Sequence, residues 1–192
     1  RMPKDFKIVG YSRTKMSDED FRKHFASAVR ERAKNFDEKI LQELLKNVSY
    51  FSGSYDDKND YESLREYLGK IEKNKNRIRV SYFSVPPSAF HDIFKNLGKV
   101  KLDTEKAKMR LVVEKPFGYD LKSAKKLKKS LYKYFKEDQF YLLDHYLGKE
   151  AVTNLLSLRY ANSILTTLLN RNFVSNIQIS AMESRDIEGR AN

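Results

Sequence analysis

The chain has 192 residues, enough for one substantial core and part of a second unit, and its hydrophobic content of 40% is ordinary for a globular protein. It contains no cysteine, which excludes disulfides and thiolate metal sites, and no apolar run approaches the roughly 20 residues of a membrane helix. The formal net charge of +12 is compatible with a lysine-rich composition, anionic small ligands or nucleic acid.

Short apolar segments alternate with amphipathic helices along most of the chain. Apolar residues spaced three and four apart indicate the helices, and compact runs rich in Val, Ile, Tyr and Phe indicate the strands. We predict, in chain order, a strand over 6–10, a helix over 17–35, a helix over 36–48, extended chain over 50–55, a helix over 61–71, a strand over 77–85, a helix over 88–98, a strand over 109–114, a helix over 120–135, a strand over 140–143, a helix over 149–169 and a strand over 174–182.

This alternation predicts an α/β fold with a largely parallel, Rossmann-like sheet over residues 1–143. The organisation changes near Asp144, so we expect 144–192 to begin an α+β domain. The leucine-rich stripe of the helix over 149–169 is expected to be buried, and the strand over 174–182 to belong to a new layer. A dinucleotide fold opens with a strand and a Gly-rich turn, but no Gly-x-x-Gly or Gly-x-Gly-x-x-Gly pattern occurs in the chain.

The most informative segment follows the apolar strand over 140–143 and contains five polar or charged side chains within seven residues. Its sequence is Asp144-His145-Tyr146-Leu147-Gly148-Lys149-Glu150. His145 and Lys149 are four residues apart, so a helix would place both on one face. Together with Tyr146 they make a plausible cradle for a phosphate group. Asp144 does not favour an anion, and its natural role is to orient an imidazole; capping a helix is the competing interpretation.

Three further residues stand where predicted strands end, at the edge of an α/β sheet where ligands bind. Arg13 follows the first strand, where an arginine suits the 2′-phosphate of NADP and a carboxylate would suit NAD; an ordinary loop arginine is the alternative. Pro86 ends another strand, either as a simple stop or beside a ligand. Lys115 lies between Glu114 and Pro116, either as a turn residue or as a rigidly placed cation.

Five segments, in order along the chain, together resemble the glucose-6-phosphate dehydrogenase family. The run over 144–150 is the most specific of them. The five are Val9-Gly10-Tyr11-Ser12-Arg13, Val85-Pro86-Pro87, Glu114-Lys115-Pro116-Phe117-Gly118, the run over 144–150, and Glu183 with Glu188-Gly189-Arg190.

The resemblance implies an oxidoreductase that converts glucose 6-phosphate to the 6-phosphoglucono-lactone with reduction of NADP+, the first step of the pentose phosphate pathway. It implies that the chain is an internal fragment, inactive by itself, because the family's first strand and Gly-rich turn precede the matched segments and its base histidine follows them. A cytoplasmic location and a homodimer or tetramer are expected for the complete protein, with no membrane or nucleic-acid partner.

The resemblance also implies the role of each site residue. His145, Tyr146 and Lys149 would hold the sugar phosphate, and Glu183 would bind a substrate hydroxyl group. Asp144 would orient the base histidine that lies outside the chain.

The coenzyme would contact Arg13, Pro86 and Phe90, although the family often has Tyr where this chain has Phe90. Lys115 would contact both substrate and coenzyme and is counted as catalytic, and no metal is expected.

Two alternatives stay open. A basic nucleic-acid binding module without catalysis would need lysines and stacking aromatics on one face. In the lysine-rich helix over 120–135 the aromatic residues fall on the apolar stripe instead, which disfavours that reading. An NAD-linked relative acting on another phosphosugar is the second alternative, and coenzyme preference at Arg13 distinguishes it.

Overall fold

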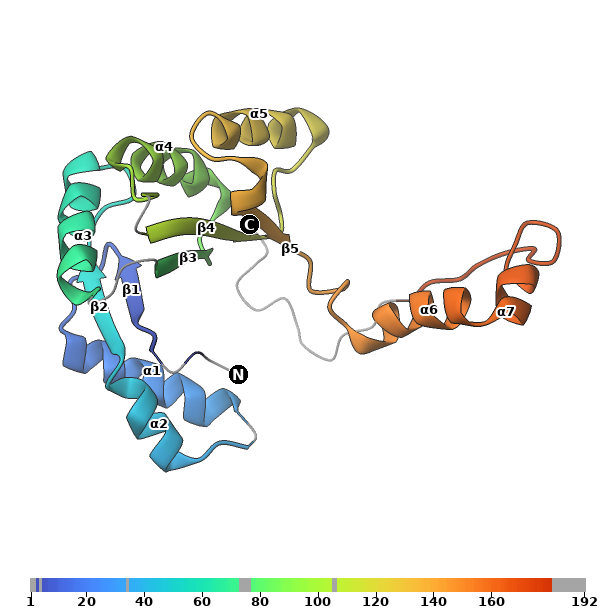
Figure 1. Ribbon diagram of the computed structural model, residues 1–192, viewed down its shortest axis with the longest axis horizontal. Helices are drawn as coiled ribbons and strands as arrows, with labels where there is room; N and C mark the ends of the chain where they lie inside the picture. The colour runs from blue at the N-terminus through green and yellow to red at the C-terminus, as the bar shows by residue number, and fades with distance from the viewer. Residues whose placement is uncertain (1–2, 4, 34, 73–76, 105–106, 181–192) are drawn as a thin grey trace. The chain divides into compact units, whose positions relative to one another are not determined.

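The computed structural model describes residues 3, 5–33, 35–72, 77–104 and 107–180, which form two compact units, 1–143 and 144–192 (Figure 1). The first unit alternates strands and helices. Its elements are β1 (Ile8–Ser12), α1 (Asp18–Arg32), α2 (Glu38–Leu45), β2 (Val48–Ser52), α3 (Lys58–Ile71), β3 (Arg77–Phe83), η1 (Pro87–Ala89), α4 (Phe90–Val100), β4 (Ala107–Glu114), α5 (Leu121–Tyr132), η2 (Glu137–Gln139) and β5 (Phe140–Leu143). The second unit contains α6 (Glu150–Ala161) and α7 (Ser163–Leu168).

Among the described residues of the first unit, the strands form two sheets, and each strand pairing is parallel. β1 pairs with β2 from Ile8 opposite Val48 to Ser12 opposite Ser52. The second sheet has the order β3-β4-β5. Parallel neighbours need a crossover connection, and helices supply it between successive strands. The predicted α/β, Rossmann-like fold is therefore confirmed.

The core lies between α4 and one face of the β3-β4-β5 sheet. Leu111 and Val113 of β4 are fully buried, as is Phe94 of α4. Burying each such side chain stabilises the fold by about 1.5–3 kcal/mol. On the opposite face of β3, Ile78 and Val80 are more than half exposed. Figure 1 shows α4 and α5 along the covered side of the sheet.

Helix ends follow local sequence signals in most places. Ser17 caps α1 by accepting a hydrogen bond from the Asp20 amide. Asp120 and Ser123 form a capping box at the start of α5. The helix predicted from residue 88 begins later, at Phe90, because Ser88 lies inside η1, and neither η1 nor α4 has a side-chain cap.

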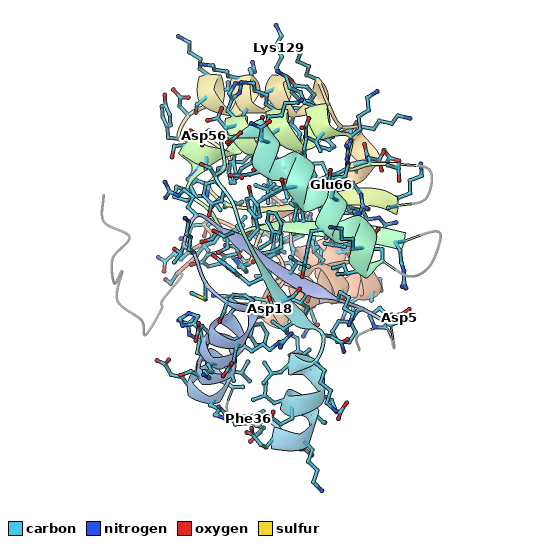
Figure 2. All side chains as sticks on the ribbon, turned by 90° about the vertical axis from the view of Figure 1, so that its left-hand side faces the viewer. Asp5, Asp18, Phe36, Asp56, Glu66 and Lys129 are labelled. Atoms are coloured by element: carbon cyan, nitrogen blue, oxygen red, sulfur yellow. The ribbon has the colours of Figure 1, made fainter. Side chains whose placement is uncertain are left out.

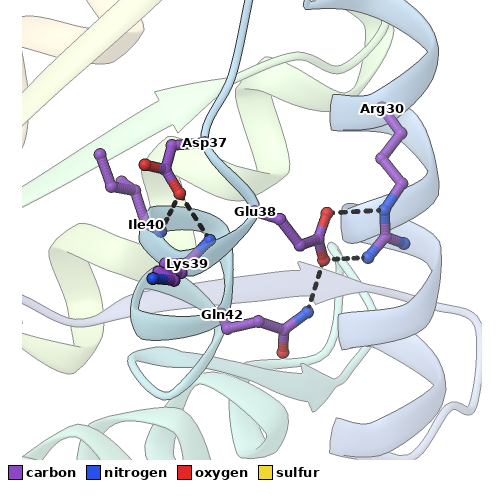
Figure 3. A network of polar contacts seen from close by, with 6 residues as sticks. All are labelled: Arg30, Asp37, Glu38, Lys39, Ile40 and Gln42. Carbon is purple, nitrogen blue, oxygen red and sulfur yellow. Dashed lines mark hydrogen bonds and ion pairs between the residues drawn. The ribbon is translucent and has the colours of Figure 1, made fainter.

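Hydrogen bonds between polar side chains connect the end of α1 to the start of α2, as Figure 3 shows. Arg30 at the end of α1 donates two hydrogen bonds to Glu38, and Gln42 donates a third. Asp37 caps α2 by accepting from two backbone amides. The pKa of Glu38 is lowered, chiefly by the Arg30 hydrogen bond and then by the Gln42 hydrogen bond.

The second unit differs from the sequence prediction in three ways. The single helix over 149–169 is two helices, because Asn162 ends α6 and its side chain caps α7. The stripe expected to be buried is exposed, with Leu155 and Leu156 more than half accessible. Residues 174–180 form no strand, and 181–182 lie outside the described part of the chain.

Across the residues that the structure describes, no helix combines the length and apolarity needed to cross a bilayer.

Candidate functional site

Four of the predicted site residues stand just past the carboxyl ends of strands. Arg13 follows β1, Pro86 lies three residues beyond β3, and Lys115 follows β4 directly. Asp144 follows β5 directly in the chain. Because β3, β4 and β5 are parallel, their carboxyl ends lie at one edge of the sheet, where open α/β folds bind ligands.

Lys115 lies in the bend that directly follows β4. The peptide bond between Lys115 and Pro116 is cis, and the lysine is exposed. The neighbouring Glu114 accepts a hydrogen bond from the Tyr82 hydroxyl on β3, and this bond is the main cause that raises the pKa of Tyr82. A cation and a carboxylate therefore follow one another where β4 ends.

Arg13 is exposed at the end of β1, with its guanidinium carbon 5.4 Å from the centre of the Tyr55 ring. Tyr55 lies in the loop after β2, beside Asp56, which Figure 2 labels. The pKa of Asp56 is lowered, first by a hydrogen bond from the Ser54 hydroxyl, with a smaller contribution from the Arg13 charge. An exposed guanidinium at a strand end suits a phosphate group.

The loop after β2 needs the glycine at its first position. A Cβ atom on Gly53 would lie 2.6 Å from the Tyr11 hydroxyl oxygen, so any side chain there would displace the Tyr11 ring. That hydroxyl donates to the Ser54 carbonyl at 2.7 Å. The pKa of Tyr11 is raised, chiefly by burial and then by Asp60, so Tyr11 serves as a neutral hydrogen-bond donor.

Pro86 and Phe90 differ in what they can offer a coenzyme. Pro86 is exposed at the start of η1. Phe90 is 1% exposed, stacks on Phe94 at 5.7 Å between ring centres, and meets Phe83 edge-on. This structure therefore does not support the expected contact between Phe90 and a coenzyme, since the side chain belongs to the core.

In the second unit, residues 145–148 form a turn rather than a helix, and α6 begins at Glu150. The shared helical face expected for His145 and Lys149 is therefore wrong. The Asp144 Oδ1 atom accepts a hydrogen bond from the Tyr146 amide at 3.0 Å. The Lys149 ammonium nitrogen lies 4.3 Å from the centre of the Tyr146 ring. The turn thus brings a cation, a phenol and an exposed imidazole together in one short segment.

Glu183 and the Glu188-Gly189-Arg190 motif lie outside the described residues. His91 is an exposed α4 residue that hydrogen-bonds Ser130 through Nδ1 at 2.9 Å. Among the residues that the structure describes, no group of three or more His, Asp or Glu side chains could hold a metal ion.

Sequence reasoning missed Tyr55 and Tyr82, which contact Arg13 and Glu114. The sequence carried a signal for Tyr82, because it falls on the more exposed of the two alternating faces of β3, and the structure pairs it with Val112 of β4. The position of Tyr55 depends on the pairing of β1 with β2, which sequence patterns do not specify.

Comparison with known proteins identifies one family. The family model described as the NAD binding domain of glucose-6-phosphate dehydrogenase matches residues 1–154. The glucose-6-phosphate 1-dehydrogenase of Schizosaccharomyces pombe is 42% identical over 193 residues, which cover 99% of this chain and 38% of that protein. The Saccharomyces cerevisiae enzyme is 40% identical over 188 residues, covering 96% of this chain and 37% of that protein.

Two solved structures that resemble this chain are also glucose-6-phosphate dehydrogenases. A glucose-6-phosphate dehydrogenase in complex with its substrate glucose 6-phosphate superposes with a TM-score of 0.76 at 38% identity, covering 86% of this chain and 35% of that one. The Mycobacterium avium enzyme gives 0.72 at 34% identity, covering 88% of this chain and 36% of that one. The chain spans little more than a third of the length of these relatives. It belongs to the glucose-6-phosphate dehydrogenase family.

Proposed function

We propose that the protein containing this chain oxidises glucose 6-phosphate at C1 and transfers the hydride to NADP+, giving the 6-phosphoglucono-lactone. Family membership carries the proposal, together with the run over 144–150. A solved relative at 38% identity is described as a complex with its substrate glucose 6-phosphate. The nucleic-acid alternative gains no support from these relatives.

The substrate phosphate would be held by His145, Tyr146 and Lys149. The distance of 4.3 Å between the Lys149 nitrogen and the Tyr146 ring supports the idea that these side chains act together. A lysine ammonium and a phenol supply several donors to phosphate oxygens without proton transfer. Their contribution is ground-state binding and orientation of the sugar. Glu183 would bind a sugar hydroxyl group.

Asp144 would orient the imidazole of a base histidine that this chain does not contain. A carboxylate in this role fixes the imidazole tautomer and stabilises the imidazolium formed when the proton leaves O1 of the sugar. The hydrogen bond from the Tyr146 amide to Asp144 Oδ1 supports this role, because it restricts the orientation of the carboxylate. Lys115, just past β4, would contact both the sugar and the coenzyme.

The nicotinamide coenzyme, when bound, supplies the hydride acceptor. The residues present fit a dinucleotide, because Arg13 and Lys115 place cations past the carboxyl ends of parallel strands. We propose that Arg13 binds the 2′-phosphate, which makes NADP+ the preferred coenzyme. Pro86 would line the coenzyme side of its turn.

The test is the absorbance of reduced coenzyme after the full-length protein is mixed with glucose 6-phosphate and NADP+, with NAD+ in a parallel sample. We expect the signal to rise with NADP+ and to require the sugar phosphate. A folded, full-length protein that gives no signal with either coenzyme would contradict the proposed reaction. A faster reaction with NAD+ would contradict only the role of Arg13.

We also propose that the complete protein is a cytoplasmic homodimer or tetramer, as expected from the family resemblance. Light scattering coupled to size-exclusion chromatography of the complete protein measures its mass directly. A mass equal to one chain at micromolar concentration would contradict this assembly.

A further inference from the structure

The loop after β2 is fixed against its neighbours by several independent contacts. The Gly53 amide donates to the Ser12 carbonyl at 3.0 Å, and the Ser54 amide donates to the Asp60 carboxylate at 2.7 Å. The Tyr11 hydroxyl donates to the Ser54 carbonyl. Residues 53–54 are therefore held by β1 on one side and by α3 on the other.

Tyr55, the next residue, is anchored through both its backbone and its ring. Its carbonyl accepts a hydrogen bond at 3.1 Å from the side chain of Asn96, the buried polar residue of α4. Its ring lies 6.1 Å from the Tyr11 ring, within reach of a favourable aromatic contact. These two contacts restrict the position of the ring beside Tyr11, near the end of β1.

Arg13 is a long, exposed side chain with many rotamers, and binding a ligand costs the entropy of fixing it. The cation–π contact with the Tyr55 ring, at 5.4 Å from the guanidinium carbon to the ring centre, restricts it in advance. The attraction between the guanidinium charge and the Tyr55 ring occupies no N–H group, whereas phosphate recognition uses the N–H groups. Both interactions can therefore exist at once, unlike a competing ion pair with the Asp56 carboxylate.

We propose that Tyr55 is the positioning residue for Arg13, and that through Arg13 it sets the preference for a coenzyme with a 2′-phosphate over one with a 2′-hydroxyl. The inference depends on the role of Arg13 under the proposed function. Its consequence is selective, because only the coenzyme that engages the guanidinium loses affinity when the ring is removed.

Calorimetric titration of the full-length protein with NADP+ and with NAD+ tests this proposal. Tyr55→Leu keeps apolar volume but removes the aromatic face, so the Kd for NADP+ should rise about two- to fivefold. The Kd for NAD+ should stay the same. Tyr55→Phe keeps the ring and should behave like the unchanged protein for both coenzymes.

A matched control comes from α5, where the Lys128 nitrogen lies 5.2 Å from the centre of the Tyr132 ring. Tyr132→Leu removes a similar cation–π pair away from the carboxyl ends of the strands, and it should change neither dissociation constant. A change as large as that of Tyr55→Leu would mean that loss of such a ring acts through general stability, and would overturn the proposal.

Arg13→Ala distinguishes two roles, that of Arg13 in binding the 2′-phosphate and that of Tyr55 in positioning Arg13. It should weaken NADP+ binding and leave NAD+ binding unchanged; if both coenzymes respond equally, the proposed role of Arg13 fails. Given a selective effect of Arg13→Ala, adding Tyr55→Leu to that variant should cause no further loss. A further loss of NADP+ affinity, or an equal loss of both coenzymes in Tyr55→Leu alone, would show that Tyr55 acts independently of Arg13 and overturn the inference.

Discussion

Lys149 offers the most direct test of phosphate binding by the turn over 144–150. Its nitrogen lies over the Tyr146 ring at the start of α6. In the complete enzyme, Lys149→Ala removes a charged hydrogen-bond donor, worth about 1.5–3 kcal/mol, so the KM for glucose 6-phosphate should rise roughly 10- to 100-fold. The kcat should change little, because the contact is equally strong in the ground state and the transition state.

Steady-state kinetics at saturating coenzyme measure both constants for Lys149. Lys149→Arg is the matched variant, since it keeps the positive charge and should recover part of the affinity. An unchanged KM in Lys149→Ala would contradict the phosphate-binding role.

Substitution of Asp144 should lower kcat and change KM much less, the reverse of the effect expected for Lys149→Ala. Asp144→Asn keeps an oxygen that can accept the hydrogen bond from the Tyr146 amide, so the turn should persist. The negative charge that stabilises an imidazolium is lost, and kcat should fall by about 10²-fold or more while KM changes much less. A near-normal kcat, measured with the same assay, would leave Asp144 with a structural role only.

Residue types and spacing predicted which polar residues follow the strands, because a charged residue directly after an apolar run is visible in the sequence. Arg13 and Lys115 do stand just past β1 and β4. Residue spacing did not predict that the Phe90 side chain is buried. The apolar pattern identifies an aromatic residue near a strand end, but its packing between Phe83 and Phe94 depends on how α4 crosses the sheet.

Gly98 lies where α4 contacts the segment just after α5. A Cβ atom there would lie 2.4 Å from the Cβ atom of Tyr134, just after α5, and neither atom can move without its backbone. Gly98→Ala should therefore destabilise the protein by roughly 1–3 kcal/mol, despite the higher helix propensity of alanine. Denaturant unfolding of the complete protein, monitored by circular dichroism, measures the change.

Gly69 in α3 provides the matched control for Gly98. A Cβ atom on Gly69 meets nothing within 4 Å, so Gly69→Ala should stabilise the helix by up to about 1 kcal/mol. Equal effects of the two substitutions would mean that α4 and α5 are not in close contact at Gly98.

Glu38 gives a pH-dependent prediction for the α1–α2 turn. Its pKa is lowered in the folded protein, chiefly by the Arg30 hydrogen bond, so its stabilising contribution is present above the pKa of an unfolded glutamate, near 4.3. That contribution is lost as the pH falls through the lower folded pKa. Glu38→Gln should therefore lower the Tm slightly at pH 6, and its difference from the unchanged protein should shrink toward pH 3.

Thermal unfolding across this pH range tests the Glu38 prediction, and Arg30→Gln should give a similarly reduced dependence because it removes the partner. A difference that stays constant with pH would show that the Glu38 charge makes no contribution.

Most strands and helices of the first unit were predictable because they carry their own periodicity, and because residues such as Ser17 and Asp120 cap helix starts. The break at Asn162 was not, because the apolar pattern continues across it from Leu158 to Leu165 and hides the capping role of the asparagine. Periodicity also identifies which face of a helix is apolar without saying what covers it. That is why the stripe of α6, expected in a core, lies exposed.

The two units therefore differ in whether their apolar side chains are buried. The first encloses a core in which Leu111, Val113 and Phe94 are fully buried. In the second, neither α6 nor α7 buries a side chain. Helices of this length without a packed face are marginal in water. When the 192-residue chain is digested with chymotrypsin under native conditions, cleavage within 144–180 should be about tenfold faster than cleavage within 5–72.

Mass spectrometry of the early fragments locates those cuts, since both regions contain leucine, tyrosine and phenylalanine. The complete protein is the control. The relatives are more than twice as long as this chain, and we expect the additional residues to cover the apolar side chains of α6 and to slow cleavage there. Equal cleavage rates of 144–180 in the chain and in the complete protein would contradict this. Exposed leucines on α6 would then need a partner outside the protein to bury them.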